Sequence, residues 1–460
     1  MLVSRIRKAT KFITLLSLKP TQLMIASFAF TIGVGAVLLM LPLATQTGQQ
    51  ASLIDALFTA TSATCVTGLI VKDTGSYFSP FGQLVIISLI QIGGLGIMTF
   101  SVSLAIFMRR DMDLKRELIM HDVLNQDTLS DIKGLILFIV KMTIIFELIG
   151  AIILCFIWRN RFLSFPLTIY YSFFHSISAF CNAGFSTFSN SLTNFSKDIM
   201  TNITICLLII SGGLGFVVIK DLYENIKNKF VNKGSRKMRL KIQTKIVLTS
   251  TILLILAGFL CIFFIERDGA LSTLDTKETV AVSLFQSITS RTAGFNTFDI
   301  SKLCSATLFI IIILMFVGGC PGSTAGGIKT TTMSVLWATI VSGFRQKENV
   351  EISKRIIPAE IIQKAITVLV ASLVIVFVFT SILLYLENKQ FIDVFFETIS
   401  AFGTVGLSTG ITAELSAGGK FLITLLMFIG RLGPLTVGYA FIKRKKRVKY
   451  YYPEERIMIG

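Results

Sequence analysis

Four short polar segments, each ending near a glycine, recur at almost even intervals along this apolar chain. The glycines are Gly68, Gly184, Gly294 and Gly406, spaced 116, 110 and 112 residues apart. Their surroundings read SATCVTGL, SAFCNAGF, ITSRTAGF and SAFGTVGL, and a glycine-rich landmark follows each: GGLG at 93–96, GGLG at 212–215, GGCPG at 318–322 and GRLG at 430–433. The second landmark position lies 26, 29, 25 and 25 residues after the glycine. The octapeptide and the glycine-rich landmark thus recur four times at a similar separation, which indicates a tandem quadruplication.

The composition places these repeats in a membrane. The chain is 53% hydrophobic and only 15% charged, which is outside the range of soluble globular proteins. A membrane-spanning helix needs roughly 20 apolar residues. Eight segments meet that length: 22–44, 81–108, 134–158, 199–219, 245–266, 303–342, 363–387 and 418–442.

A shorter segment lies between the two spans of each repeat. These segments are 51–63, 166–179, 277–289 and 391–401. Irregular backbone at membrane depth is tolerated only where protein buries it or where it lines an aqueous cavity. We therefore expect an all-α membrane protein of four tandem span, pore-helix, filter-strand, span repeats, with eight transmembrane helices around one pseudo-fourfold pore. The predicted units are 1–133, 134–244, 245–362 and 363–460.

The net charge of +18 raises the alternative of nucleic-acid binding, but the distribution of basic residues argues against it. Basic residues concentrate in the joins between repeats and at the tail, including Arg109, Arg110, Lys115, Arg116, Lys220, Lys227, Lys229, Arg345, Lys347 and KRKKR at 443–447. Basic loops face the cytoplasm. Since eight spans return the chain to its starting side, we expect a multi-pass plasma-membrane protein with both termini cytoplasmic and re-entrant loops entering from outside. The seven cysteines have no metal-ligand spacing.

The segments before the four glycines can supply rings of backbone carbonyl oxygens that replace the water around a monovalent cation. Glycine suits the end of such a loop because it adopts positive φ and permits close backbone approach. None of the segments carries an Asp or Glu at or just before the glycine, which argues against selectivity for divalent ions. The blander alternative is that each glycine is a turn in a membrane loop. The predicted filter residues are Thr64, Cys65, Val66, Thr67, Gly68, Phe180, Cys181, Asn182, Ala183, Gly184, Ser290, Arg291, Thr292, Ala293, Gly294, Phe402, Gly403, Thr404, Val405 and Gly406.

The second span of the third repeat contains GGCPGSTAGG, with five glycines and a proline in ten residues. In a continuous helix each glycine costs about 1 kcal/mol and the proline about 3 kcal/mol. This span is therefore predicted to break below the filter. A static kink that lets helices pack closely is the alternative.

These motifs resemble one family. TCVTGL, CNAGF, SRTAGF and FGTVGL, together with GGCPGSTAGGIKTTT at 318–332 and MFIGRLGPLT at 427–436, are similar to the membrane subunits of bacterial Ktr potassium uptake systems in the Trk/Ktr/HKT superfamily. The resemblance covers essentially the whole chain. It implies transport of potassium, since a glycine such as Gly68 in the first filter accompanies potassium selectivity in that family. Sodium is a second candidate cation.

The resemblance also implies a gate. Its residues would be Gly318, Gly319, Gly322, Ser323, Thr324, Ala325, Gly326, Gly327, Lys329 and Arg431. Arg431 is a charge within an apolar span, and such charges normally face the bundle interior or a cavity. The family implies that it faces the pore beneath the filter, and pairing with a helix-end carbonyl is the structural alternative. Asp55, His175, Asp393 and Glu397 belong to pore helices, and we expect structural roles for them.

The chain has no phosphate-binding loop, nucleophile elbow or metal cluster in its sequence, so we expect no enzyme. ATP and ADP would act only through another chain. By resemblance, that partner is a cytosolic RCK-type ring subunit of the KtrA/KtrC type, and the chain forms a homodimer with the tail YYYPEERIMIG at 450–460 at the interface. The alternatives are an autonomous monovalent cation channel and a sodium-coupled cation transporter, the latter disfavoured because all four repeats share one orientation.

Overall fold

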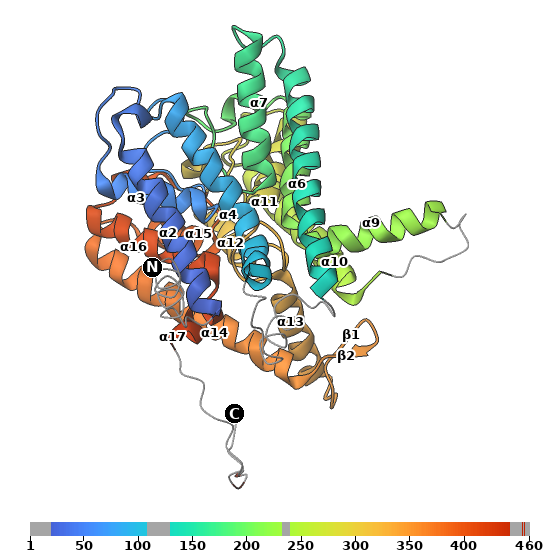
Figure 1. Ribbon diagram of the computed structural model, residues 1–460. Coiled ribbons are helices and arrows are strands. Elements are labelled where there is room, and N and C mark those ends of the chain that lie inside the picture. The colour runs from blue at the N-terminus through green and yellow to red at the C-terminus, as the bar shows by residue number, and fades with distance from the viewer. Residues whose placement is uncertain (1–19, 108–128, 232–239, 442–452, 454, 456–460) are drawn as a thin grey trace, which may run out of the picture.

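The computed structural model of this chain describes residues 20–107, 129–231, 240–441, 453 and 455. Helices dominate these residues (Figure 1). The long and short α-helices are α2 Pro20–Met40, α3 Leu53–Thr64, α4 Pro80–Phe107, α6 Leu129–Trp158, α7 Phe165–Phe180, α8 Ile199–Gly213, α9 Phe216–Val231, α10 Ile242–Glu266, α11 Thr276–Thr289, α12 Ser305–Phe316, α13 Thr330–Phe344, α14 Ala359–Leu386, α15 Phe391–Gly403, α16 Ala417–Leu432 and α17 Pro434–Phe441. The remaining elements are the 3-10 turns η1 Pro42–Ala44, η3 Thr193–Phe195, η4 Ile300–Lys302 and η5 Ile411–Glu414, and the hairpin strands β1 Glu351–Ile352 and β2 Arg355–Ile356.

The helices form four successive units of the same order, which confirms the predicted fold class. Each unit has a long helix, a shorter pore helix and a second long helix: α2, α3 and α4, then α6, α7 and α8, then α10, α11 and α12, then α14, α15 and α16. The four pore helices α3, α7, α11 and α15 begin and end within about two residues of the predicted short segments.

The four units close into a ring. The second long helix of each unit packs against the pore helix of the next, so that α4 contacts α7, α8 contacts α11, α12 contacts α15, and α16 returns to α3 of the first unit. Polar side chains join two of these helix pairs, Tyr170 to Gln83 at 2.6 Å and Lys420 to Asp55 at 2.8 Å, and Lys197, just before α8, reaches Glu278 of α11 at 3.1 Å. One chain therefore completes one central pathway.

Four described helices are long and apolar enough to cross a membrane: Thr21–Met40, Gly134–Trp158, Ile242–Glu266 and Ala359–Leu386. The number rises to six if each of two sharply bent pairs counts as one span. Pro80–Gly96 and Ser305–Phe316 are shorter apolar helices at the two remaining predicted positions.

The bent pairs correct the prediction for segments 199–219 and 418–442, which were expected to be single spans. The axes of α8 and α9 differ by 99°, and those of α16 and α17 by 94°. Each bend falls at the fourth position of the landmark, which is a glycine in both cases: Gly215 with φ +90° and Gly433 with φ +84°. A residue in this left-handed region ends a helix, and Pro434 next to Gly433 cannot continue it.

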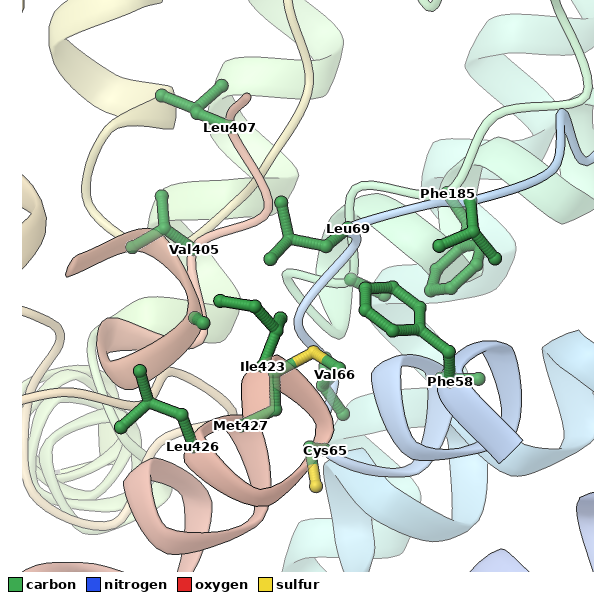
Figure 2. Close-up of a cluster of buried hydrophobic side chains, with 14 of the residues drawn as sticks. Phe58, Cys65, Val66, Leu69, Phe185, Val405, Leu407, Ile423, Leu426 and Met427 are labelled. Carbon is green, nitrogen blue, oxygen red and sulfur yellow. The ribbon is translucent and has the colours of Figure 1, made fainter. Parts of the chain in front are cut away.

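The hydrophobic core lies behind the loops that follow the pore helices. Figure 2 shows Cys65, Val66 and Leu69 of the first loop packed among side chains of the second and fourth repeats. Their neighbours include Phe58, Phe185, Val405, Leu407, Ile423, Leu426 and Met427. Since these side chains point into the core, the loop backbone is left to face the ring's axis.

The first and last described helices lie side by side, because Gln22 near the start of α2 donates a hydrogen bond of 3.0 Å to the carbonyl of Ala440 in α17. The basic residues Arg109, Arg110, Lys115 and Arg116 and the run 443–447 lie outside the described residues. Of the tail 450–460 predicted for the dimer interface, only residues 453 and 455 are described.

Candidate functional site

The four repeated glycines meet at the centre of the ring. A Cβ on Gly68 would lie 2.4 Å from the carbonyl oxygen of Ala183, and one on Gly184 would lie 2.8 Å from that of Ala293. A Cβ on Gly294 would lie 2.7 Å from the carbonyl oxygen of Val405, and one on Gly406 would lie 2.1 Å from that of Thr67. Each glycine thus contacts the carbonyl group of the residue just before the glycine of the next repeat. The contacts run from the first repeat to the second, third and fourth, and from the fourth back to the first. Contacts this short leave no room for a side chain.

Backbone geometry repeats in all four loops. The glycines have φ of +93°, +69°, +75° and +92°, and the residue two positions before each glycine also has positive φ: Val66 at 57°, Asn182 at 60°, Thr292 at 73° and Thr404 at 48°. Positive φ is uncommon for residues other than glycine and tends to occur where surrounding structure enforces it. The loops therefore share one conformation despite their different sequences.

A hydroxyl group in the last turn of each pore helix stabilises that loop conformation. Ser62 accepts a hydrogen bond from the amide of Gly68 at 3.1 Å and donates one to the carbonyl of Leu69 at 2.7 Å. Ser178 donates to Phe185 at 2.7 Å, and Ser400 accepts from Gly406 at 3.1 Å. In the third repeat, where isoleucine takes this place, the next residue Thr289 donates to Phe295 at 2.6 Å. We did not predict this role, although the serine that opens three of the four repeated octapeptides was a visible signal.

Two of the predicted filter residues, Cys181 and Arg291, have side chains that lie behind their loops. Cys181 packs near Gln91 and Glu147, with Sγ distances of 3.6 Å and 3.7 Å to their side-chain oxygens. Arg291 is 8% exposed and lines a small cavity with Gly319 behind the third loop. The predicted filter residue Arg291 thus contributes its backbone to the loop while its charge lies behind it.

Several filter hydroxyls have no protein partner. Thr64, Thr67, Thr292 and Thr404 are buried, and their Oγ1 atoms make no hydrogen bond within the part of the chain that the structure describes. A buried polar oxygen without a partner is costly, so these four hydroxyl groups are an unfavourable feature of the first, third and fourth loops.

A cavity of about 730 Å³ opens on one side of the glycine ring. All four glycines line it, together with the polar loops that follow them, including Ser186, Asn296 and Ser408. We name this cavity the vestibule of the pathway. It connects the ring of loops to one face of the protein.

The landmark glycines press the second long helices against the other end of the loops. A Cβ on Gly93 would lie 1.8 Å from the carbonyl oxygen of Thr64, one on Gly212 would lie 1.8 Å from that of Phe180, and one on Gly430 would lie 2.0 Å from that of Phe402. Gly318 of the third repeat breaks this pattern, because a Cβ on it would lie 2.2 Å from the carbonyl oxygen of Gly326 instead.

The third repeat departs because its second span is interrupted, as predicted. Helix α12 ends at Phe316 and α13 begins at Thr330, and we name the segment 317–329 between them the cross-loop. It contacts the second repeat: Thr324 donates to the carbonyl of Phe180 at 3.3 Å, and the carbonyl of Gly322 accepts from Phe216 at 2.9 Å. It also reaches the fourth repeat, since a Cβ on Gly326 would lie 1.9 Å from Oγ1 of Thr404. The cross-loop therefore passes beneath the filter loops, at the end opposite the vestibule.

Two cationic side chains hold the cross-loop. Arg431 on α16 is 6% exposed and donates from Nη1 to the carbonyl of Thr324 and from Nη2 to the carbonyl of Gly93 at 2.8 Å. Lys329 donates to the carbonyl of Ala325 at 2.7 Å. Arg431 thus joins the first, third and fourth repeats at one point.

Fold and site together define a multi-pass membrane protein with four pore-loop repeats around one central pathway. Residues 7–450 match the TrkH family model, described as a cation transport protein. The chain belongs to this family of cation transport proteins.

Several bacterial relatives are similar to nearly the whole chain. It is 41% identical over 443 residues to Ktr system potassium uptake protein B of Bacillus subtilis (strain 168), covering 96% of this chain and 97% of that protein. Identity to Potassium/sodium uptake protein NtpJ of Enterococcus hirae is 35% over 452 residues, covering 96% of this chain and 98% of that protein. The crystal structure of the potassium transporter TrkH from Vibrio parahaemolyticus aligns with a TM-score of 0.74 over 93% of this chain and 86% of that one, at 17% identity, which is evidence for the shared fold.

Proposed function

We propose that this chain mediates potassium uptake across the bacterial plasma membrane through a selectivity filter built from its four loops. The observation that carries the proposal is the closed ring of Gly68, Gly184, Gly294 and Gly406, each against the neighbouring loop's carbonyl. A ring of backbone carbonyls provides oxygen ligands for a dehydrated monovalent cation without fixing a charge in the path. The names of the Ktr relatives support potassium as the cation.

The four units 1–133, 134–244, 245–362 and 363–460 each contribute one loop in this proposal. Residues 64–68, 180–184, 290–294 and 402–406 form the filter. The side chains of Cys181 and Arg291 lie behind these loops, and in this proposal selectivity depends on carbonyl spacing and on the small size of glycine. The name of the NtpJ relative supports sodium as a second cation to test.

The proposed gate is the cross-loop, with residues 318–327 as its moving part and Lys329 and Arg431 as its anchors. Its position beneath the filter and its hydrogen bonds to Phe180 and Arg431 support a closed state in the structure. Its glycines have little steric cost of rearrangement. Opening would require the Arg431 bond to Thr324 to break.

Regulation by a cytosolic RCK-type ring subunit with bound ATP or ADP is part of the proposal, as is a homodimer. The word "system" in the names of the Ktr relatives supports a further subunit. Basic residues such as Lys220, Lys227 and Arg345 would face the cytoplasm with both termini, and the vestibule would face outside. A ring that binds the open cross-loop more tightly than the closed one would raise the open population.

The direct test is uptake in a bacterium that lacks its own potassium transporters, with this chain supplied alone or with a ring subunit. Growth at low potassium only with the ring subunit is the expected result. Growth with the chain alone would identify an autonomous channel, and growth that requires sodium would favour a sodium-coupled transporter. No growth under any of these conditions, with the chain present in the membrane, would contradict the proposal.

A further inference from the structure

Two serines in the vestibule are held in the same way on opposite sides of the ring. Ser186 and Ser408 each lie two residues after a filter glycine, in the second and fourth repeats, and both line the vestibule. Ser186 contacts Nε2 of His175 at 3.0 Å, and Ser408 donates to the carboxylate of Glu397. His175 and Glu397 each lie nine residues before the same glycines, within the pore helices.

The direction of each hydrogen bond follows from its partners. Nδ1 of His175 lies 2.8 Å from the carbonyl of Tyr171, which can only accept, so Nδ1 carries the proton and Nε2 accepts from Ser186. The Ser186 oxygen in turn accepts from the amide of Phe188 at 3.0 Å.

The fourth repeat reproduces this arrangement. Ser408 donates its only proton to Glu397 and accepts from the amide of Gly410 at 2.9 Å, and Thr412 donates to the other carboxylate oxygen at 2.9 Å. Phe188 and Gly410 both lie four residues after their filter glycine. Both hydroxyl protons are therefore directed into the protein.

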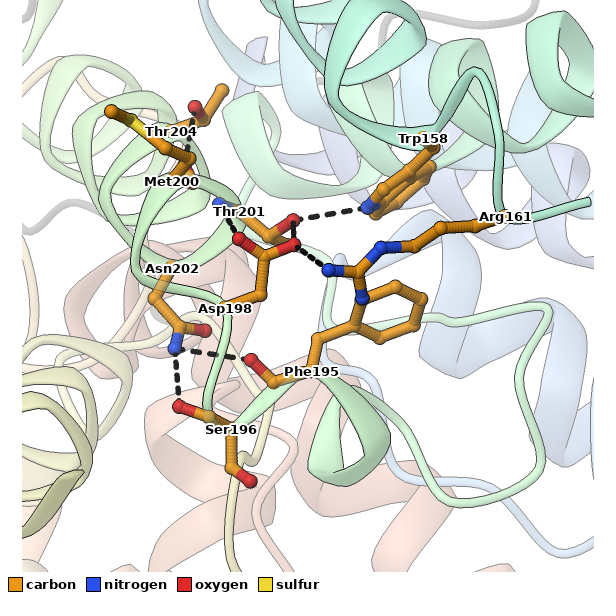
Figure 3. A network of polar contacts seen from close by, with 9 residues as sticks. All are labelled: Trp158, Arg161, Phe195, Ser196, Asp198, Met200, Thr201, Asn202 and Thr204. Carbon is orange, nitrogen blue, oxygen red and sulfur yellow. Dashed lines mark hydrogen bonds and ion pairs between the residues drawn. The ribbon is translucent and has the colours of Figure 1, made fainter. Parts of the chain in front are cut away.

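His175 is fixed in place by an aromatic cluster. Its ring stacks on Phe188 with a centroid distance of 4.5 Å and meets the edge of Trp158 at 5.4 Å. Figure 3 shows how Trp158 is itself held: its Nε1 donates to Thr201 at 3.0 Å, and Thr201 donates to Asp198 at 2.8 Å. Asp198 also pairs with Arg161 at 3.0 Å. The acceptor nitrogen therefore has one orientation.

The first and third repeats lack this pair. Ile70 and Asn296 occupy the positions of the two serines, and Thr59 and Phe285 occupy those of the acceptors. The vestibule thus has two braced serine hydroxyls across from each other and no equivalent hydroxyl at these positions in the other two repeats.

We propose that Ser186 and Ser408 form an outer cation-binding site in which their hydroxyl oxygens replace part of the ion's water before it enters the filter. His175 and Glu397 are positioning residues, because they hold the hydroxyl protons away from the vestibule and leave oxygen lone pairs available to the cation. Oxygen ligands of this kind suit a monovalent cation during dehydration. The inference rests on the proposed function, since it places the site next to the proposed filter.

The test is the concentration dependence of potassium flux into proteoliposomes, with KM and maximal rate measured separately. The serine variants are Ser186→Ala, Ser408→Ala and the double variant, and Ser186→Thr and Ser408→Thr retain the hydroxyl. Loss of one hydroxyl is expected to raise KM about threefold to tenfold with the maximal rate little changed, and the threonine variants are expected to keep the wild-type KM. Thr193→Val removes a vestibule hydroxyl that donates to the carbonyl of Asn190, and is the matched control.

The positioning roles are tested with Glu397→Gln and His175→Phe. Glutamine leaves one acceptor oxygen for the two hydroxyl groups of Ser408 and Thr412, and phenylalanine removes the acceptor of Ser186, so KM should rise in both variants. An unchanged KM in the serine double variant, or a fall in maximal rate alone, would overturn the proposal. Wild-type flux that lacks potassium selectivity would instead count against the proposed function, so the two failures are distinguishable. If either acceptor variant does not fold, the serine variants decide the question.

Discussion

Arg431 donates a hydrogen bond to the carbonyl oxygen of Thr324, which lies 107 residues earlier in the chain, directly beneath the four filter loops. The same guanidinium bonds the carbonyl of Gly93 in the first repeat. A planar group with several fixed donors can satisfy both carbonyls at once, which a lysine ammonium does with less geometric control. This single side chain ties the cross-loop to the ring in the observed state.

Arg431→Ala should therefore raise potassium flux. Each charge-assisted bond contributes about 1.5–3 kcal/mol, and a loss of this size shifts a two-state equilibrium by about tenfold or more toward release of the cross-loop. Deletion of residues 322–327 should have the same effect, and Arg431→Lys an intermediate one. The potassium flux of each variant is measured in proteoliposomes at fixed protein density. Unchanged flux in both the alanine and the deletion variants would exclude the cross-loop as the barrier.

Gly326→Ala should also release the cross-loop, by steric conflict. The added Cβ would lie 1.9 Å from Oγ1 of Thr404 and 2.9 Å from the carbonyl oxygen of Gly403, so the loop cannot keep its place against the fourth filter. The matched control is Gly343→Ala on α13, where an added Cβ meets nothing within 4 Å. We expect higher flux in the first variant only. Equal flux in the two variants would show that contact with Thr404 does not hold the loop.

Ser62→Ala should weaken ion discrimination more than it lowers expression. The hydroxyl bridges the amide of Gly68 and the carbonyl of Leu69, and its loss leaves buried groups without partners at a cost of about 1–3 kcal/mol. Ser88→Ala removes a hydroxyl that donates to the carbonyl of Leu84 on an exposed helix face, and serves as control. The ratio of potassium to sodium flux reports the effect. A ratio equal to that of the control would mean that the filter does not depend on Ser62.

The Lys420–Asp55 pair should stabilise the closure of the ring between the fourth and first repeats. Its side chains are only 14% and 12% exposed, so Lys420→Met should cost about 1–3 kcal/mol and lower the apparent unfolding temperature in detergent. The double variant with Asp55→Asn should recover part of the loss. Lys389→Met breaks a more exposed pair with Glu414 and should change little. An equal effect of the two lysine variants would argue against a special role for ring closure.

The sequence alone predicted the four repeats, the pore helices and the interruption at the glycine-rich run 318–327, because each has a local signal in apolar length or glycine content. The bends after Gly213 and Leu432 were missed, since the apolar runs continue through them and the glycine at the fourth landmark position stays helical in the first repeat, at Gly96. The positive φ of the non-glycine residues Val66, Asn182, Thr292 and Thr404 was also missed, since the folded surroundings enforce it.

The site was predictable in its positions but not in its contacts. The repeated octapeptides locate the loops, yet the partners of Arg431 lie 107 and 338 residues away, and such pairing depends on how the four units close. His175 and Glu397 were expected to be structural because each lies in a pore helix. Their shared contact with a vestibule serine becomes visible only when the second and fourth repeats are compared in space.

Flux into proteoliposomes is the sharpest test of whether the glycine ring forms a cation-selective filter. Potassium and sodium flux would be compared for the wild type, Gly68→Ser and Gly48→Ser, since Gly48 also has positive φ but its added Cβ meets nothing within 4 Å. Gly68→Ser places a side chain against the carbonyl of Ala183, so we predict that this variant loses potassium preference while Gly48→Ser retains it. Wild-type selectivity in Gly68→Ser would show that the glycine ring is not the filter.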